Sequence, residues 1–263
     1  MPLDFAIRGA SLTPGCAEFE SIDYALNISN PIRVSSISRI DSHSLSLVEE
    51  SPVPAPPALI EQCFNRVEYY QPLYGVTGIE GPLRSCRDRA VVIEAALDSL
   101  GRRFSLVDFG SSLGFFPFFF ADRGAQTTGV DINPENTAVA IATQRVNGLS
   151  ATFKTAPLDL TTVSTISPGQ YDVALALTML HHITLRRGMD NVTQLVAELL
   201  ARIPTLIVEL AHRDEDVSFA WRESLPKDPL EILSVCGNIQ IQHLGDFSSY
   251  LSSSVRPMYL VKR

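Results

Sequence analysis

After residue 86, stretches with apolar residues at helical spacing alternate with short, strand-like apolar runs, and this alternation predicts the fold. Residues 87–100 carry apolar side chains at helical spacing and stop at Gly101, after which FSLVDFG reads as a short buried strand. The later strand-like runs are TTGVDI, ATFKTAPLDL, YDVALALTML, TLIVEL, IQIQHLGDF and RPMYLVKR, with helix-like runs at 115–123, 134–146, 190–203 and 229–235. Alternating helices and strands are typical of a parallel sheet covered on both faces. The last two strand-like runs have no helix between them, so one of these strands must run antiparallel.

The expected fold is therefore an α/β, Rossmann-like, doubly wound sheet of seven strands, mostly parallel with an antiparallel C-terminal strand. Residues 1–50 differ from the rest, because they are rich in Ser and Ile and suit short strands or an extended arm. The run SPVPAPPA that follows favours a stiff, polyproline-like linker. We predict an N-terminal arm and Pro-rich linker over residues 1–58 and the α/β domain over 59–263. The arm is interpreted as a packing or dimerisation appendage, which would make the protein a homodimer.

The amino-acid composition excludes several classes of protein. Of 263 residues, 45% are hydrophobic and 19% charged, a balance that excludes disorder over most of the length. The net charge of −8 argues against a protein that binds DNA by neutralising phosphates. No secretory signal or membrane span is evident, and the cysteines lack metal-ligand spacing, so we expect a cytoplasmic protein with free thiols and no bound metal. The cysteines are Cys16, Cys63, Cys86 and Cys236.

Residues 106–131 carry the clearest chemical pattern: strand, glycine turn, helix, strand and acid. In such folds a ligand lies beyond the carboxyl ends of the strands. Glycine at the first turn lets backbone amides approach the ligand closely, and Asp131 at the end of the second strand can accept both ribose hydroxyls of a nucleoside. The alternative interpretation of Asp131 is an ordinary turn acid. The glycine turn before it favours ribose binding.

Two cofactor classes use this layout. Dinucleotide enzymes need G-x-G-x-x-G, and counting from Gly110 puts Ser112 and Phe115 at the second and third glycine positions. Phe115 is too large for the third position, which argues against a nicotinamide cofactor. The chain instead reads D-x-G-x-x-x-G from Asp108 to Gly114.

This loop resembles the first signature of class I S-adenosylmethionine-dependent methyltransferases, with Ser112 where the family more often has glycine. The resemblance implies that the loop holds the amino-acid end of S-adenosyl-L-methionine and that Asp108 orients its ammonium group. On the residues alone, Asp108 could instead cap the next helix. The cofactor-binding residues that the resemblance implies are Tyr70, Asp108, Gly110, Ser111, Ser112, Gly114, Phe115, Asp131, Ile132, Asp159, Leu160 and Leu177.

The resemblance extends over residues 66–263. Asp159 matches a position that often meets the adenine amino group, although it could also be a solvated loop acid. The run YDVALALTMLHHI looks like the family's fourth-strand signature, and the two final strands match its antiparallel hairpin. LHHI, SLPKDPLEIL and SVRPMYLVKR further resemble the methyltransferase domain of bacterial kinase–methyltransferases that terminate polysaccharide chains. Since the sequence shows no kinase portion, we do not expect that substrate to carry over.

His181 and His182 follow the fourth strand, where the cofactor's methyl group should point. A neutral imidazole there could take a proton from a hydroxyl nucleophile, so both are candidate catalytic residues, with a structural loop role as the alternative. A carboxylate or phosphate acceptor would need no base but would need cations. The candidate cations are Arg87, Arg89, Arg186, Arg187 and Arg256.

The sequence thus predicts a methyltransferase that acts on an oxygen (hydroxyl, carboxylate or phosphate) of a small molecule or glycan. DNA N-methylation is disfavoured, because the fourth strand ends in LTML without an Asn or Asp to accept an amine proton. Two rival hypotheses are a methyltransferase-fold binding module without turnover and an NAD-dependent oxidoreductase.

Overall fold

The computed structural model describes residues 53–79, 81–101, 103–216, 219–249 and 253–263. Contacts divide the chain into two compact units, Met1–Glu49 and Glu50–Arg263. All described residues belong to the second unit. The predicted arm over residues 1–50 lies outside them.

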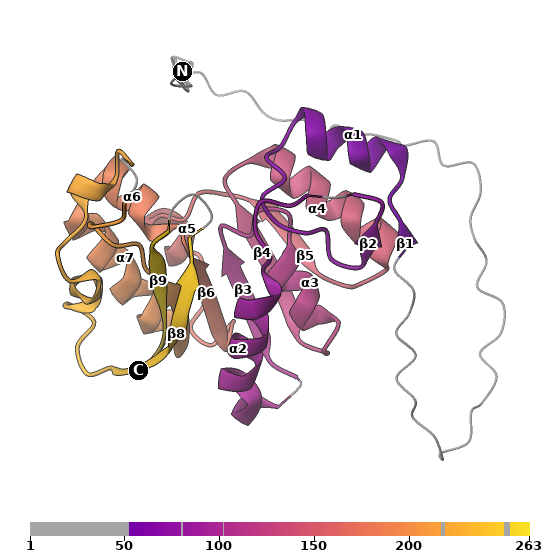
Figure 1. Ribbon diagram of the computed structural model, residues 1–263. Helices are drawn as coiled ribbons and strands as arrows, with labels where there is room; N and C mark the ends of the chain where they lie inside the picture. The colour runs from indigo at the N-terminus through magenta and orange to yellow at the C-terminus, as the bar shows by residue number, and fades with distance from the viewer. Residues whose placement is uncertain (1–52, 80, 102, 217–218, 250–252) are drawn as a thin grey trace, which may run out of the picture. The chain divides into compact units, whose positions relative to one another are not determined.

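A seven-stranded sheet forms the centre of the second unit (Figure 1). In sheet order its strands are β5 (Thr152–Thr155), β4 (Gln126–Asp131), β3 (Ser105–Phe109), β6 (Val173–Leu177), β7 (Thr205–Glu209), β9 (Val255–Lys262) and β8 (Gln240–Ser248). The first five in this order are mutually parallel, and β9 runs antiparallel to both of its neighbours. The predicted fold class is confirmed.

Helices cover both faces of the sheet because alternate strand residues point to opposite sides. On one face, Leu195 and Leu199 of α7 pack in a cluster with Val107 and Val208. On the other face, α2 and α3 pack in a second cluster that includes Leu106 and Ile207. The helices are α1 (Pro57–Asn65), α2 (Arg87–Leu97), α3 (Phe115–Ala121), α4 (Pro134–Asn147), α5 (Leu160–Ser164), α6 (Leu180–Arg187) and α7 (Met189–Arg202). The short 3₁₀ segments are η1 (Asp98–Leu100), η2 (Arg222–Ser224) and η3 (Pro229–Leu233).

The segment that the sequence assigned to a stiff linker takes part in the domain. Val53–Pro54 forms β1, which pairs in parallel with β2 (Val76–Thr77), and α1 begins at Pro57. Proline is compatible with this first helical position, since the missing N–H has no partner in a helix anyway. Leu59 and Cys63 of α1 are buried in a cluster with Val139 of α4. The polyproline interpretation therefore does not describe residues 53–58.

Several strands end earlier than their apolar runs suggest, and these early ends form the functional edge. β5 stops at Thr155, so that Ala156 to Asp159 form a loop before α5. β6 stops at Leu177, and α6 starts only three residues later at Leu180. Within the described ranges, no helix is long and apolar enough to cross a membrane.

Candidate cofactor and active site

Three adjoining cavities lie where β3, β4 and β6 end, and Gly110 lines all of them. The outer cavity has a volume of about 320 Å³, the central cavity about 470 Å³ and the small cavity about 30 Å³. The outer and central cavities also share Asp131, Met179 and His182. They form one connected edge of the sheet, at the place expected for a ligand in this kind of fold.

The glycine loop turns through left-handed backbone conformations. Gly110 has φ +74° and Gly114 φ +85°. A Cβ atom on Gly114 would lie 2.8 Å from Cε1 of Phe153, so a larger residue would clash with β5. Ser112 also has a positive φ of +49°, a region that L-residues rarely occupy. The serine thus adopts the conformation that a glycine would take without strain.

Asp131 is held at the mouth of both larger cavities. Its Oδ2 accepts a hydrogen bond from the backbone N–H of Ser112 at 2.8 Å. Its Oδ1 accepts the backbone N–H of Asn133 at 2.8 Å and Nδ2 of Asn136 at 3.2 Å. A carboxylate offers about four acceptor positions, so roughly one stays available for a ribose hydroxyl. The carboxylate is fixed in place before any ligand binds.

Asp108 faces the small cavity and is almost fully buried. Its Oδ2 has no hydrogen-bond partner among the described residues. Burial, reinforced by the negative charge of Asp131, raises the pKa of Asp108 well above its usual range. The residue belongs to β3, and the N-cap of the following helix is Gly114, so the helix-capping interpretation is wrong. A buried, unpaired carboxylate is costly, which marks this oxygen as a binding group for a cation.

A second unpartnered polar atom faces the same small cavity. Arg84 is buried, and its Nε lacks a partner in the part of the chain that the structure describes. Its other nitrogens are used: Nη2 bonds to Glu209 Oε1 at 2.6 Å, and Nη1 donates to the hydroxyl oxygen of Tyr70 at 2.5 Å. The small cavity therefore pairs one free acceptor, Asp108 Oδ2, with one free donor, Arg84 Nε. Sequence reasoning missed Arg84, since only the fold brings it beside the glycine loop.

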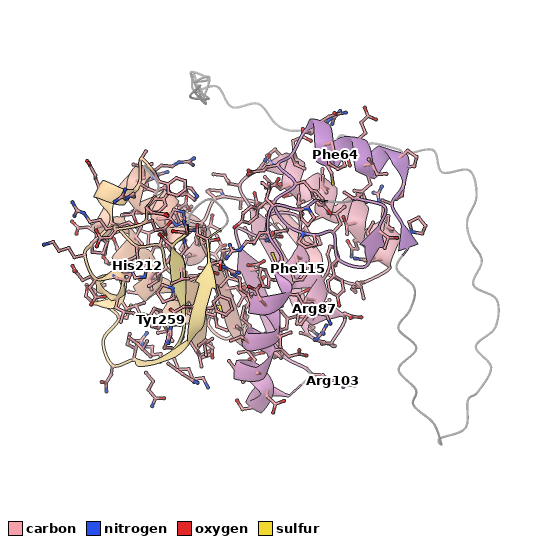
Figure 2. The ribbon with its side chains drawn as sticks, viewed as in Figure 1. Phe64, Arg87, Arg103, Phe115, His212 and Tyr259 are labelled. Atoms are coloured by element: carbon pink, nitrogen blue, oxygen red, sulfur yellow. The ribbon has the colours of Figure 1, made fainter. Side chains whose placement is uncertain are left out.

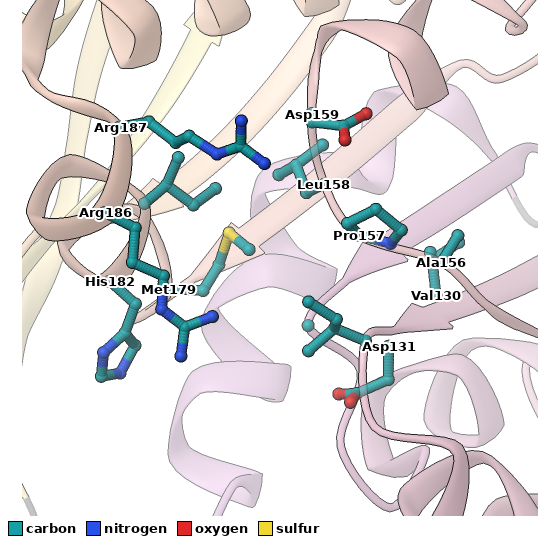
Figure 3. Close-up of a pocket in the computed structure, with 13 residues that line it drawn as sticks. Val130, Asp131, Ala156, Pro157, Leu158, Asp159, Met179, His182, Arg186 and Arg187 are labelled. Carbon is teal, nitrogen blue, oxygen red and sulfur yellow. The ribbon is translucent and has the colours of Figure 1, made fainter. Parts of the chain in front are cut away.

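The outer cavity lies between the loop after β5 and the helix after β6. Ile132, which is 60% exposed, and Asp159 line it, and the Asp159 carboxylate also caps α5 by accepting the N–H of Thr162 at 2.8 Å. Figure 3 shows Arg187 extending from the opposite side toward Leu158, whereas Arg186 extends past Met179 on the side of His182 and Asp131. The sequence placed these two arginines among candidate cations, and the structure puts them at this cavity.

Both predicted catalytic histidines line the central cavity, in the first turn of α6. Their rings lie 4.1 Å apart, and the ring of His181 lies 4.6 Å from that of Trp221. Burial, with the charges of His182 and Arg256, lowers the pKa of His181 well below its usual value. Desolvation, with the charges of Arg186 and Arg256, lowers the pKa of His182 as well. Both imidazoles are therefore neutral near pH 7.

Arg256 closes the central cavity from β9. Its Nε and Nη2 bond to the two carboxylate oxygens of Glu215 at 2.7 and 2.9 Å, and its guanidinium lies 5.5 Å from the centre of the Trp221 ring. Glu215 is fully buried, so this ion pair is held rigidly. This arginine, which lines the same cavity as the histidines, is therefore already balanced by a carboxylate.

The remaining predicted cofactor residues divide into two groups. Tyr70, Ser112 and Leu177 line the central cavity, and Ser111 is buried in the loop. Phe115, which Figure 2 labels, instead packs in the core, stacked on Phe119 and edge-on to Tyr74. Leu160 packs against the other core cluster. Phe116 is the phenylalanine that lines the small cavity. Of the other candidate cations, Arg87 is exposed and Arg89 is buried against Glu209.

The strand order, the D-x-G-x-x-x-G loop and the fixed acid at the end of β4 define a class I S-adenosylmethionine-dependent methyltransferase domain, to which this chain belongs. The antiparallel β9 lies between β7 and β8, whereas dinucleotide-binding sheets end in a parallel sixth strand. Residues 107–202 match a family model described as a methyltransferase domain. S-adenosyl-L-methionine is the cofactor of this class, and the free acceptor and donor of the small cavity suit its ammonium and carboxylate groups.

The domain is similar to that of WbdD, the O-antigen chain terminator bifunctional methyltransferase/kinase of Escherichia coli. The two are 32% identical over 200 residues, which is 74% of this chain and 28% of WbdD. A crystal structure of WbdD matches with a TM-score of 0.70 at 30% identity and covers 78% of this chain and 46% of that one. A ubiquinone biosynthesis O-methyltransferase of Bordetella bronchiseptica is 26% identical over 136 residues, or 52% of each chain. The chain thus spans about a quarter of the length of its WbdD relative.

Proposed function

We propose that this domain transfers the methyl group of S-adenosyl-L-methionine to an oxygen atom of a small molecule or glycan. The names of the relatives support this target: one is an O-methyltransferase, and the other terminates O-antigen chains. The observation that carries the proposal is the pair of neutral histidines on the wall of the central cavity, beside the glycine loop.

Cofactor binding is assigned to the groups that the three cavities present. Asp131 would bind the ribose, with Ile132 and Asp159 lining the adenine side. Asp108 and Arg84 would bind the ammonium and the carboxylate in the small cavity, which Tyr70 helps to enclose. The bound cofactor supplies an electrophilic methyl group on its sulfonium, so the protein's main contribution is to align a nucleophile.

The acceptor is assigned to the central cavity, which the histidines and the Trp221 ring line. Because Arg256 is balanced by Glu215, this cavity offers neutral proton acceptors and no unbalanced cation of its own. That chemistry favours a hydroxyl acceptor, whose proton His181 or His182 would take as the oxygen attacks. Trp221 would pack against the apolar part of such an acceptor.

An ionised acceptor, phosphate or carboxylate, is the second candidate. One observation favours it: Arg186 and Arg187 both line the outer cavity, and Arg187 extends toward Leu158 on its far wall (Figure 3). Two guanidinium groups at the mouth could bind an anion, and such a nucleophile would need no base. The expected homodimer and the expected cytoplasmic location stay predictions.

Calorimetric titration with S-adenosylhomocysteine tests the cofactor site. We expect micromolar binding to the wild type, a loss on the order of 10- to 100-fold in Asp131→Asn, and no binding of NAD. Asp98→Asn, at an exposed aspartate of η1, is the matched control and should bind as the wild type does. Wild-type protein that binds NAD but not S-adenosylhomocysteine would contradict the proposal.

Labelled methyl transfer to a panel of sugars, phenols, sugar phosphates and carboxylic acids then tests turnover. Transfer to a hydroxyl supports the first assignment, and transfer only to phosphates or carboxylates supports the second. Cofactor binding without transfer to any member of the panel would favour the binding-module hypothesis.

A further inference from the structure

Glu209, the last residue of β7, is fully buried and binds two arginines at once. Its Oε1 accepts Nη2 of Arg84 at 2.6 Å and Nη2 of Arg89 at 3.0 Å, and its Oε2 accepts Nε of Arg89 at 2.6 Å. These bonds join β7 to α2 and to the segment before α2, which are 120 and 125 residues away in the chain. A charged group this deep in a protein is costly unless it has a task or a full set of partners.

Arg89 supplies the charge balance. Besides Glu209 it bonds to the backbone oxygen of Ser248 at 2.9 Å and to Asp88 Oδ2 at 2.9 Å, and its guanidinium lies 4.8 Å from the centre of the Phe247 ring. It is 2% exposed, and although it lines the small cavity, each of its three guanidinium nitrogens already has a partner. Two carboxylates, Glu209 and Asp88, therefore balance the charges of the two arginines.

Arg84 is held on three sides, and only its Nε stays unpartnered among the described residues. Glu209 binds Nη2, while the Tyr70 and Thr178 hydroxyl groups bind Nη1 at 2.5 and 3.3 Å. Thr178 is itself fixed by Glu209, because its backbone N–H donates to the Glu209 backbone oxygen at 3.2 Å and its φ is +54°. Glu209 thus sets both the direction of Arg84 and the turn at the end of β6.

We infer that Glu209 is a positioning residue for the amino-acid end of the cofactor. By holding Arg84, it keeps one guanidinium donor at the small cavity that the free oxygen of Asp108 also lines, so that Arg84 and Asp108 bind an α-carboxylate and an α-ammonium group together. This inference rests on the proposed function, since it assumes that S-adenosyl-L-methionine occupies these cavities. Glu209 would then contribute to the selectivity for the zwitterionic amino-acid end of the cofactor without touching the ligand.

Two probes separate this role from general structural support. S-adenosylhomocysteine carries the amino-acid end, and 5′-methylthioadenosine lacks it. For Glu209→Gln we expect the calorimetric affinity for S-adenosylhomocysteine to fall about 10- to 100-fold, the range typical when a supporting partner of a binding group is removed. The affinity for 5′-methylthioadenosine should stay within about twofold of the wild-type value, because Asp131 and the outer cavity are unchanged.

Glu209→Asp is the second variant, in case the neutral residue leaves the arginines too poorly compensated to fold. It keeps the charge but withdraws the carboxylate by one methylene, so the same selective loss is expected. Glu94→Gln is the control, since Glu94 is also a carboxylate paired with an arginine, Arg123 at 2.6 Å, but lines none of the three cavities and does not touch Arg84. Its ratio of the two affinities should equal that of the wild type.

The outcomes distinguish the proposed methyltransferase function from the positioning role of Glu209. Wild-type protein that binds neither probe would contradict the proposed function itself. Wild-type binding with an equal loss of both probes in the Glu209 variants, or with no loss, would overturn the positioning role and leave the methyltransferase assignment intact.

Discussion

The backbone N–H of Ser112 donates a 2.8 Å hydrogen bond to Oδ2 of Asp131, and this bond joins the loop after β3 to the acid at the end of β4. The loop can make it because Ser112 adopts a φ of +49°. Ser112 therefore holds a backbone conformation that glycine adopts without strain. The loop and Asp131 form one preorganised unit, and a fixed carboxylate lowers the entropic cost of binding a ligand.

Ser112→Gly should stabilise the domain without changing this unit. Glycine adopts positive φ at no steric cost, whereas an L-residue loses about 1–2 kcal/mol there. The greater flexibility of glycine in the unfolded chain offsets part of the gain, so we expect about 0.5–1 kcal/mol from urea unfolding. Affinity for S-adenosylhomocysteine should stay within about twofold.

Gly114→Ala is the opposing control for this measurement. Its φ is +85°, and its Cβ would lie 2.8 Å from Phe153, so it should destabilise the domain and weaken cofactor binding. If Ser112→Gly destabilised the protein instead, the serine side chain would have a role that the strain argument omits.

Asp108→Asn should raise stability and lower cofactor affinity together. The pKa of Asp108 is raised in the folded state, so the wild-type protein loses stability as pH rises from the usual carboxyl range through that raised value. The neutral amide removes this loss, and we expect a gain of roughly 1 kcal/mol at pH 7, or about 2–4 °C in Tm. The gain should shrink in acid, where the wild-type carboxyl group also becomes neutral.

The same variant should bind S-adenosylhomocysteine about tenfold more weakly or worse, because the ammonium loses its charged partner. Thermal unfolding between pH 4 and 8, beside calorimetry at pH 7, gives both quantities. Unchanged affinity in Asp108→Asn would remove this residue from the cofactor site, whatever its effect on stability.

The sheet, the glycine loop and the position of Asp131 could be predicted from the sequence, because each depends on residues that are close together in the chain. Apolar period predicts strands and helices, and a loop between two adjacent parallel strands must meet the acid at the end of the second. The sequence was not sufficient for Arg84 and Glu209, which are separated by 125 residues and meet only in the folded sheet. A buried arginine and a buried glutamate look like surface charges in a sequence.

Two predictions about single segments failed for physical reasons. The prolines at 52–57 suggested an extended linker, but Pro57 lies at the start of α1, where its ring is tolerated. Phe115 was expected beside the cofactor, yet the helix turns it toward Tyr74 and Phe119 and leaves Phe116 at the small cavity. Five of the six residues 115–120 are phenylalanines. A shift of the helix start by one residue would therefore change which phenylalanine faces the cavity.

His181 and His182 should act as proton acceptors that remain neutral into mild acid. Both pKa values are lowered, so with a hydroxyl acceptor kcat/KM should stay level from pH 8 through about 6.5 and fall only below it. Replacing the acting base by Gln should lower kcat by on the order of 10²- to 10⁴-fold, with S-adenosylhomocysteine affinity within about twofold. A loss of less than tenfold in both single variants would favour an acceptor that is already ionised.

A stability measurement tests the buried state of His181 without any acceptor. Its folded-state pKa lies below the value near 6.5 of an unfolded histidine, so the unfolded chain binds more protons in that range. The contribution of His181 to stability should therefore be complete above about pH 6.5 and decline as pH falls through that value. It is measured as the difference in urea unfolding between the wild type and His181→Gln from about pH 5 to 8. A difference that stays flat over this range, or that changes in the wild type's favour toward acid, would contradict a lowered pKa of His181 in the folded protein.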